Sequence, residues 1–257
     1  MSPAFEAVGE SADHYGDWGA RLRLEIPFLA SLLRLQGARR VCDAGCGEGR
    51  HTIALAQAGF EMTGVDPREE ALVQARQAAQ HAGAVVQFHR GGFQSLPRVP
   101  GAPFDAVLAW GNSLSLVGGW EDLDASVRGV ADAIAEGGVF ICQVPNYRIF
   151  DDPAKRWRPL REAPGPEAGQ PVLLMKHFAP WSERYFAAEF VRIWRDSEKG
   201  WTSEVKQVRL LALTEDRLEA CLAQQFEIVA RRGHADGRPF DPDSPDLIVV
   251  ARKSPPR

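Results

Sequence analysis

Three glycines alternate with other residues near position 45, and this spacing suits a ligand site. The segment reads Asp43-Ala-Gly-Cys-Gly-Glu-Gly, which places Gly45, Gly47 and Gly49 directly after an acidic residue. Glycine tolerates backbone conformations that other residues avoid, and it lets a ligand approach the backbone closely. A second acidic residue, Asp66, ends the next apolar segment. Glycine clusters of this kind hold nucleotide-like ligands.

Three classes of nucleotide-like ligand are distinguished by the residues around the glycines. A dinucleotide site requires a third glycine where Arg50 stands, and a phosphate loop requires a Gly-Lys-Ser or Gly-Lys-Thr ending that this segment lacks. Asp43 would repel a pyrophosphate, but it suits a cationic portion of a ligand, directly or through a water molecule. The ammonium and sulfonium groups of S-adenosylmethionine have this positive charge.

Alternating strands and helices are predicted to position these residues. The pattern of apolar residues and helix stops predicts a helix at 20–37, a strand at 39–45, a helix at 49–59, a strand at 61–66, a helix at 67–83, strands at 84–91 and 104–111, a helix at 120–138 and a strand at 139–145. Such alternation implies parallel strands joined by right-handed crossovers, with helices on both faces. Ligands bind at the carboxyl ends of such strands.

The pattern changes after Pro145. We expect a long loop at 151–171, three antiparallel strands at 171–181, 183–196 and 201–214, a helix at 214–225, and two last strands of the main sheet at 226–233 and 246–253. The predicted fold class is α/β, with a Rossmann-like, seven-stranded, mostly parallel, doubly wound sheet and an antiparallel insertion after the fifth strand.

The segment VCDAGCGEGRHTIALAQAGFEMTGVDPREEAL resembles the first two motifs of class I S-adenosylmethionine-dependent methyltransferases. The order of elements matches this family across roughly residues 20–253. The resemblance implies a methyltransferase domain at 19–253 with an insertion at about 146–212, an N-terminal arm or lid at 1–18 and a tail at 254–257. It also implies S-adenosyl-L-methionine as cofactor and S-adenosyl-L-homocysteine as product.

The family resemblance assigns roles to individual residues. Gly45 and Gly47 would pass under the methionine part of the cofactor, and Asp66 would accept hydrogen bonds from both ribose hydroxyls. An acidic or amide residue that contacts adenine in this family is replaced by Gly92, so the backbone and the Phe93 ring would take over, unless Phe93 is plain core. The expected cofactor-binding residues are Tyr15, Arg21, Asp43, Ala44, Gly45, Cys46, Gly47, Asp66, Pro67, Gly92, Phe93, Trp110 and Gly111.

A closer likeness is carried by GNSLSL and GGVFICQVPNY, which are similar to the glycine N-methyltransferase branch. In that branch a loop asparagine orients the acceptor amine, and Asn112 is its counterpart; Arg21 lines up with the arginine that holds the cofactor carboxylate. The branch reads Arg-Asn-Tyr where this chain has Pro145-Asn146-Tyr147, so glycine is doubtful as the substrate. We expect Asn112 and Tyr147 to be catalytic, and the acceptor to be bound by Asn112, Asn146, Tyr147, Arg161 and Tyr185.

The chemistry leaves several alternatives open. An amine need only arrive neutral, whereas a hydroxyl acceptor would require a general base, for which the chain offers His14, His177 and His234. The favoured function is methyl transfer to a small-molecule amine; the alternatives are a small-molecule O-methyltransferase and a non-catalytic S-adenosylmethionine-binding module. Tryptophans and tyrosines of the insertion could form a cage for the acceptor or simply build its core.

Composition sets the expected surroundings of the protein. A net charge of −4 and a pI of about 5.9 argue against nucleic acid as a partner, and against an RNA methyltransferase. Four cysteines without a Cys-x-x-Cys pair indicate reduced thiols and no metal site, which fits a cytoplasmic chain. We expect no signal peptide and no membrane-spanning segment. A small-molecule methyl acceptor is the expected partner, and assembly into a homo-oligomer stays open.

Overall fold

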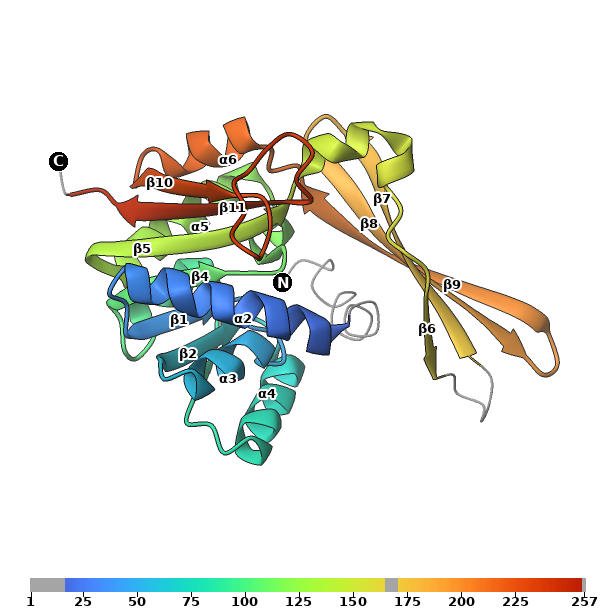
Figure 1. Cartoon of the computed structure of the whole chain (residues 1–257), viewed down its shortest axis with the longest axis horizontal. Helices are drawn as coiled ribbons and strands as arrows, with labels where there is room; N and C mark the ends of the chain where they lie inside the picture. Colours follow the sequence, from blue (N-terminus) through green and yellow to red (C-terminus); the bar gives the residue numbers. More distant parts are fainter. Residues whose placement is uncertain (1–16, 165–170, 256–257) are drawn as a thin grey trace. The chain divides into compact units, whose positions relative to one another are not determined.

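The glycine-rich turn follows β1, a buried strand inside a seven-stranded sheet (Figure 1). The structure is a computed structural model that describes residues 17–164 and 171–255. The order of strands across the sheet is β10-β11-β5-β4-β1-β2-β3. Their bounds are β1 Arg40–Ala44, β2 Glu61–Asp66, β3 Gln87–Arg90, β4 Phe104–Ala109, β5 Ile134–Pro145, β10 Phe226–Arg232 and β11 Asp246–Lys253.

Strands β1 to β5 pair in parallel, and β11 pairs antiparallel with both β5 and β10. The predicted Rossmann-like sheet with two late strands is therefore confirmed. The helices of this part of the chain are α2 Trp18–Leu35, α3 Arg50–Gln57, α4 Glu69–His81, α5 Trp120–Ala133 and α6 Glu215–Leu222, with short 3₁₀ helices η2 Phe93–Arg98 and η3 Ser113–Leu116. Figure 1 shows α2 in front of the sheet and α5 behind it.

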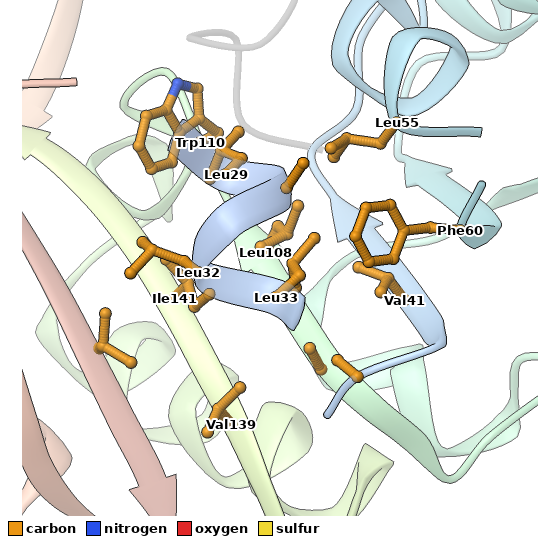
Figure 2. Packing of buried hydrophobic residues seen from close by; sticks show 14 of the residues in the cluster. Leu29, Leu32, Leu33, Val41, Leu55, Phe60, Leu108, Trp110, Val139 and Ile141 are labelled. Atoms are coloured by element: carbon orange, nitrogen blue, oxygen red, sulfur yellow. The ribbon is translucent and has the colours of Figure 1, made fainter. Parts of the chain in front are cut away.

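Helix α2 is held on the sheet by one apolar stripe. Leu29, Leu32 and Leu33 recur at helical spacing and are almost completely buried. Figure 2 shows them facing Leu108 of β4 and Ile141 of β5. Burial of one leucine side chain contributes about 1.5–3 kcal/mol, so three such contacts fix the position of α2 firmly. This helix carries Arg21 and therefore fixes where that residue can reach.

The chain divides into two compact units. One consists of Gly19–Asn146 and Leu213–Arg257 and contains the large sheet. The other contains Tyr147–Ala212 and is built on a four-stranded antiparallel sheet in the order β6-β7-β8-β9. Its elements are η4 Tyr147–Asp151, η5 Pro153–Lys155, β6 Arg161–Pro164, β7 Pro171–Ser182, β8 Tyr185–Asp196 and β9 Gly200–Leu211. The three predicted antiparallel strands are confirmed as β7, β8 and β9.

Aromatic side chains form the core of this second unit. The ring of Phe150 stacks on Phe178 at 4.3 Å and 12°, and the ring of Phe186 lies 5.7 Å from that of Phe150. Tyr147 adds a ring 5.3 Å from Phe186. Trp157, in contrast, is 51% exposed and stacks on His177 at 4.2 Å. Trp181 and Trp201 are likewise 57% and 69% exposed, so the core interpretation is wrong for these tryptophans and holds for Tyr147. A cage for the acceptor stays a prediction.

Two sequence-based boundaries were wrong. The segment 151–171 is not one long loop, because Arg161–Pro164 pairs with β7 and η5 precedes it. The many prolines and glycines of this segment favoured a loop, whereas β6 is a strand because it pairs with β7, which follows it in the chain. Helix α5 ends at Ala133 rather than Gly138, because Ile134 already pairs with Phe104. A Cβ at Gly138 would lie 2.7 Å from the Asp105 carbonyl oxygen, so the chain passes close to β4 there.

Cysteine and hydrophobicity patterns add two observations. The four cysteines are free, and Cys42 and Cys142 are buried in the sheet. Among residues 17–164 and 171–255, no helix combines the length and the apolar character needed to cross a membrane.

Candidate cofactor site

The turn after β1 has the backbone geometry that only glycine adopts readily. Gly45, Gly47 and Gly49 have positive φ angles of 82°, 55° and 78°. The N–H groups of Gly45 and Cys46 donate to the Val65 carbonyl oxygen at 2.7 and 3.1 Å, which ties the turn to β2. A Cβ on Gly45 would lie 2.5 Å from Ser113 Oγ. The turn is thus held tightly between neighbouring elements, with its backbone as the surface that a ligand can approach.

Asp66 ends β2 beside this turn and is 4% exposed. Its Oδ2 accepts the Gly47 N–H at 2.9 Å. Its Oδ1 accepts the Arg68 N–H at 3.0 Å and the Arg68 Nε–H at 3.2 Å. The backbone of Pro67, between them, accepts a hydrogen bond from Arg90 Nε at 3.3 Å. The carboxylate predicted to bind a ribose is therefore fixed in orientation at the carboxyl end of its strand.

Asp43 lies before the glycines on β1 and is 3% exposed. Thr52 Oγ1 donates to its Oδ2 at 2.6 Å. Burial raises the pKa of Asp43 and the charge of Asp66 raises it further, while His51 and the Thr52 hydrogen bond oppose this, so the net shift is upward. A buried carboxylate of this kind is stabilised by any cation that approaches it. The site therefore favours the positive portion of a ligand.

Cys46 occupies the turn between two of the glycines and is half-buried. Burial raises the pKa of its thiol well above the usual value, and the charges of Asp43 and Asp66 add to this. The thiol therefore stays protonated near neutral pH and is a poor nucleophile. Its neighbour Ala44 is buried in β1. Neither side chain brings reactive chemistry to the turn, so their contribution is through shape and backbone.

A buried ionic network joins α2 to α3 beside the glycine turn. Glu25 is 5% exposed, and its Oε2 lies 2.7 Å from His51 Nε2. Arg21 contacts Glu25 Oε1 through Nε at 3.2 Å and through Nη2 at 3.0 Å. Burial raises the pKa of Glu25, but the hydrogen bond from His51 and the charges of Arg21 and His51 outweigh it, and the pKa is lowered. Arg21 thus reaches this region as part of an ion pair.

The end of β4 contributes Trp110 and the segment after it. Trp110 is 4% exposed, with its ring 6.3 Å from that of His51. Its buried Nε1 has no hydrogen-bond partner among the described residues. A buried donor of this kind normally finds a partner, so a ligand or water group on this side of β4 would satisfy it. Gly111 donates its N–H to Gln143 Oε1 at 3.1 Å.

Asn112 has a φ of 74° and is the sole residue other than glycine with positive φ in the described part of the chain. Asparagine tolerates this left-handed conformation better than most residues. Asn112 precedes η3, and its carbonyl accepts the Ser115 N–H at 2.9 Å. Next to it, Ser113 Oγ lies 2.9 Å from the Trp110 carbonyl and 3.2 Å from that of Gly45. The segment that carries Asn112 is therefore joined to the glycine turn through Ser113, and the role of Asn112 in the acceptor site stays a prediction.

Gly92 and Phe93 follow β3. A Cβ on Gly92 would meet nothing within 4 Å, and its φ of −116° suits any residue. The position is open, so nothing nearby requires glycine. Phe93 is 8% exposed and begins η2, with Gly129 of α5 packed against its carbonyl. Whether its ring stacks on a cofactor stays a prediction.

The residues expected to bind the acceptor lie on two units. The Asn146 side-chain Nδ2 donates to the carbonyl oxygens of Pro242 and Ser244, both at 2.9 Å, within the first unit. In the second unit Tyr147 is 1% exposed within the aromatic core, Arg161 begins β6, and Tyr185 begins β8 under the Arg209 guanidinium at 4.9 Å. Their roles stay predictions. Tyr15 and His14 lie outside the described residues.

Sequence reasoning missed three polar residues of this site. The Arg21-Glu25 pair has the i, i+4 spacing of a helix ion pair, and that spacing was a usable signal. Arg68 is two residues beyond Asp66 and could have been considered with it. His51 meets Glu25 across 26 positions, and no local pattern indicates such a contact.

Comparisons with known proteins agree with this geometry. Residues 41–138 match the family model described as a methyltransferase domain. The chain is 31% identical over 147 residues to the glycine/sarcosine N-methyltransferase of Aphanothece halophytica, covering 57% of this chain and 56% of that protein. It is 34% identical over 119 residues to a ubiquinone biosynthesis O-methyltransferase of Azorhizobium caulinodans, covering 46% of this chain and 45% of that protein. The chain spans about half the length of the curated relatives it matches.

A solved structure shares the fold over nearly the full length. The crystal structure of an S-adenosylmethionine-dependent methyltransferase from Clostridium acetobutylicum superposes with a TM-score of 0.75 at 15% identity, covering 98% of both chains. The glycine turn, the acidic strand ends and these matches agree with one another. Residues 41–138 therefore match a methyltransferase domain, and the relatives and the shared fold support a class I S-adenosylmethionine-dependent methyltransferase near the glycine N-methyltransferase branch.

Proposed function

We propose that this protein transfers the methyl group of S-adenosylmethionine to a nitrogen of a small amine. The observation that carries the proposal is the joint placement of the glycine turn, Asp43 and Asp66 at the ends of β1 and β2. The residues fit the cofactor: a partly exposed glycine backbone for close approach, a buried carboxylate for its cationic part, and a fixed carboxylate for a diol. When bound, the cofactor supplies a methyl group already activated by a sulfonium.

The residues of the chain then act mainly by positioning and by excluding water. Asp66 orients the ribose end, and Asp43 favours the cationic end. Asn112, held beside the glycine turn by η3, would direct the amine lone pair by accepting an N–H from it. No general base is required if the amine arrives neutral.

The residue at the end of β5 narrows the class of acceptor. Pro145 has no charge and no N–H donor, and it pairs with Asp246 in the ladder between β5 and β11. The resemblance places an arginine for a substrate carboxylate at this position. We therefore propose an amine that does not rely on a carboxylate contact at this position, which disfavours glycine itself.

The direct test is methyl transfer from labelled S-adenosylmethionine to a panel of amines and phenols. Asn112→Gly is the informative variant, because it keeps the left-handed backbone and removes the side chain. Asn112→Ala adds backbone strain and reports that cost separately. We expect Asn112→Gly to lower kcat with the best amine while cofactor binding is retained. An unchanged rate would remove Asn112 from the acceptor site.

Cofactor binding has its own test. Calorimetry should show binding of S-adenosylhomocysteine, and Asp66→Ala should weaken it by at least tenfold, since a charge-assisted hydrogen bond contributes about 1.5–3 kcal/mol. Tight binding by this variant would mean that the ribose is held elsewhere. Binding without turnover on any acceptor would favour the non-catalytic binding module.

O-methyl transfer is the second candidate, favoured by the 34% identity to an O-methyltransferase. A hydroxyl acceptor needs a base, and His177 is the predicted candidate with a suitable partner. Its Nδ1 lies 2.8 Å from Glu189 Oε2, and the other oxygen of Glu189 accepts from Gln207 Nε2 at 3.0 Å. This arrangement fixes the ring and leaves Nε2 as an acceptor. A phenol-methylating activity that is lost in His177→Gln while cofactor binding is retained would support this candidate.

A further inference from the structure

The Arg68 side chain is hydrogen-bonded to Asp66, the carboxylate that the proposed site offers to the cofactor ribose. Its Nε–H donates to Asp66 Oδ1 at 3.2 Å, with both side chains largely buried at 18% and 6% exposure. Within the described part of the chain, Asp66 is the only acceptor that this guanidinium contacts. The Arg68 guanidinium also lies over the turn, since its Nη2 would be 3.5 Å from a Cβ on Gly47. The arginine side chain therefore covers the ribose end of the site.

The acceptor capacity of Asp66 is nearly used up in this state. A carboxylate offers about four acceptor positions. Three are taken, by the N–H groups of Gly47 and Arg68 and by the Arg68 Nε–H. A ribose with two hydroxyls needs two positions, so one of the present donors has to leave.

The three donors differ in how easily they can leave. The Gly47 N–H belongs to a turn bonded to β2, and the Arg68 N–H belongs to the N-cap residue directly before α4. Moving either one would rearrange a whole element. The Arg68 Nε–H sits on a flexible side chain that can rotate toward solvent at the cost of one hydrogen bond. The guanidinium is therefore the donor that yields.

We propose that Arg68 stands in for the ribose hydroxyls in the free protein and is displaced when the cofactor binds. Arg68 is then a determinant of affinity that works against binding, and its effect depends on how many hydroxyls the ligand offers. A ligand with a single hydroxyl can use the remaining acceptor position without displacing the arginine. This inference rests on the proposed cofactor site, with Asp66 as its ribose contact.

The experiment compares Arg68→Met with the unmodified chain by calorimetry. Methionine keeps an unbranched side chain and removes the donor and the charge. The probes are S-adenosylhomocysteine and its 2′-deoxy analogue. We expect Arg68→Met to bind S-adenosylhomocysteine about tenfold more tightly, equivalent to about 1.4 kcal/mol, and the deoxy analogue roughly twofold more tightly or less. Arg76→Met is the matched control, because Arg76 pairs with Glu69 and with the Phe88 carbonyl oxygen rather than with Asp66, and its loss should change neither affinity.

Two outcomes would overturn the inference. Equal or weaker binding of S-adenosylhomocysteine by Arg68→Met would make the arginine a cofactor contact rather than a competitor. Equal tightening for both ligands would indicate a general effect of charge. If the methionine variant does not fold, Arg68→Leu, which also removes the donor and the charge, replaces it under the same criteria. Binding is measured without an acceptor, so a chain that binds but methylates nothing would refute the proposed function alone, whereas no binding by the unmodified chain would overturn both.

Discussion

Replacing Gly45 by alanine tests whether the glycine turn is shaped by contact as well as by conformation. The added Cβ would carry two costs. The φ of 82° is left-handed, which costs a residue with a Cβ roughly 1–2 kcal/mol. The Cβ would also lie 2.5 Å from Ser113 Oγ and 2.6 Å from Ser113 Cβ, and overpacking of this kind costs about 1–3 kcal/mol. We therefore expect Gly45→Ala to lower the free energy of unfolding by about 2–5 kcal/mol.

Two further variants separate these costs. Gly37→Ala meets nothing within 4 Å at a φ of 70°, so it reports the conformational cost alone, about 1–2 kcal/mol. Ser113→Gly removes both clashing atoms and leaves the Cα at 3.9 Å from the new Cβ. In a double-mutant cycle it should recover the contact part of the Gly45→Ala loss, about 1–3 kcal/mol, even though it forfeits a serine hydrogen bond.

The assay is urea unfolding followed by circular dichroism for the four chains and the unmodified protein. The difference between Gly45→Ala and Gly37→Ala gives the contact term directly. Equal losses in the two alanine variants, or no coupling between Gly45→Ala and Ser113→Gly, would refute the close approach between the turn and the segment after β4. S-adenosylhomocysteine binding by the double variant would then show how far the turn geometry sets affinity.

Three more predictions concern the open position at Gly92 and the charges of Glu25 and Asp43. Gly92→Asp should bind S-adenosylhomocysteine about fivefold more tightly, because the position is open and a carboxylate there could accept the adenine amino group; Gly92→Ala, or a ligand with hypoxanthine in place of adenine, should show no gain. Glu25→Gln should flatten the loss of stability in acid: the partners of Glu25 lower its pKa, so the carboxylate stabilises the fold above its ordinary value of 4.5, and this is lost as pH falls through the lowered pKa. An acid unfolding profile identical to that of the unmodified chain would contradict the Glu25–His51 ion pair. Asp43→Asn should stabilise the free protein at pH 7, because burial raises the pKa of Asp43 and stability is lost as pH rises from 3.8 through the raised value; the same change should weaken S-adenosylmethionine binding. Lower stability at pH 7 would show that the carboxylate is not strained by burial.

Local signals in the sequence predicted the elements and the turn well. The glycine spacing, Asp43 before it and Asp66 after the next strand depend on residues near one another in the chain, and the structure places all of them at neighbouring strand ends. The same holds for the β7, β8 and β9 strands, whose apolar residues show their pattern directly.

Contacts between distant residues could not be predicted in this way. The ion pair between Glu25 and His51 depends on how α2 crosses the sheet. That crossing is determined by the packing of the apolar stripe of α2 on the sheet, which the sequence of α2 alone does not specify. Strand β6 depends on a partner, because Arg161–Pro164 has little strand character until β7 lies beside it. The early end of α5 follows from pairing with β4 rather than from helix propensity.

Asn146 is the last residue of the first unit before the segment Tyr147–Ala212 of the second unit. Its side chain and its N–H bind the carbonyls of Pro242, Ser244 and Pro245, so the end of β5 is fastened to the segment that leads into β11. The segment Tyr147–Ala212 therefore begins directly after a residue that is fixed by hydrogen bonds within the first unit. We therefore expect insertions and deletions between Tyr147 and Ala212 to leave the register of β5 against β11 unchanged. We likewise expect such changes to leave the glycine turn and Asp66 in place, because both belong to the first unit.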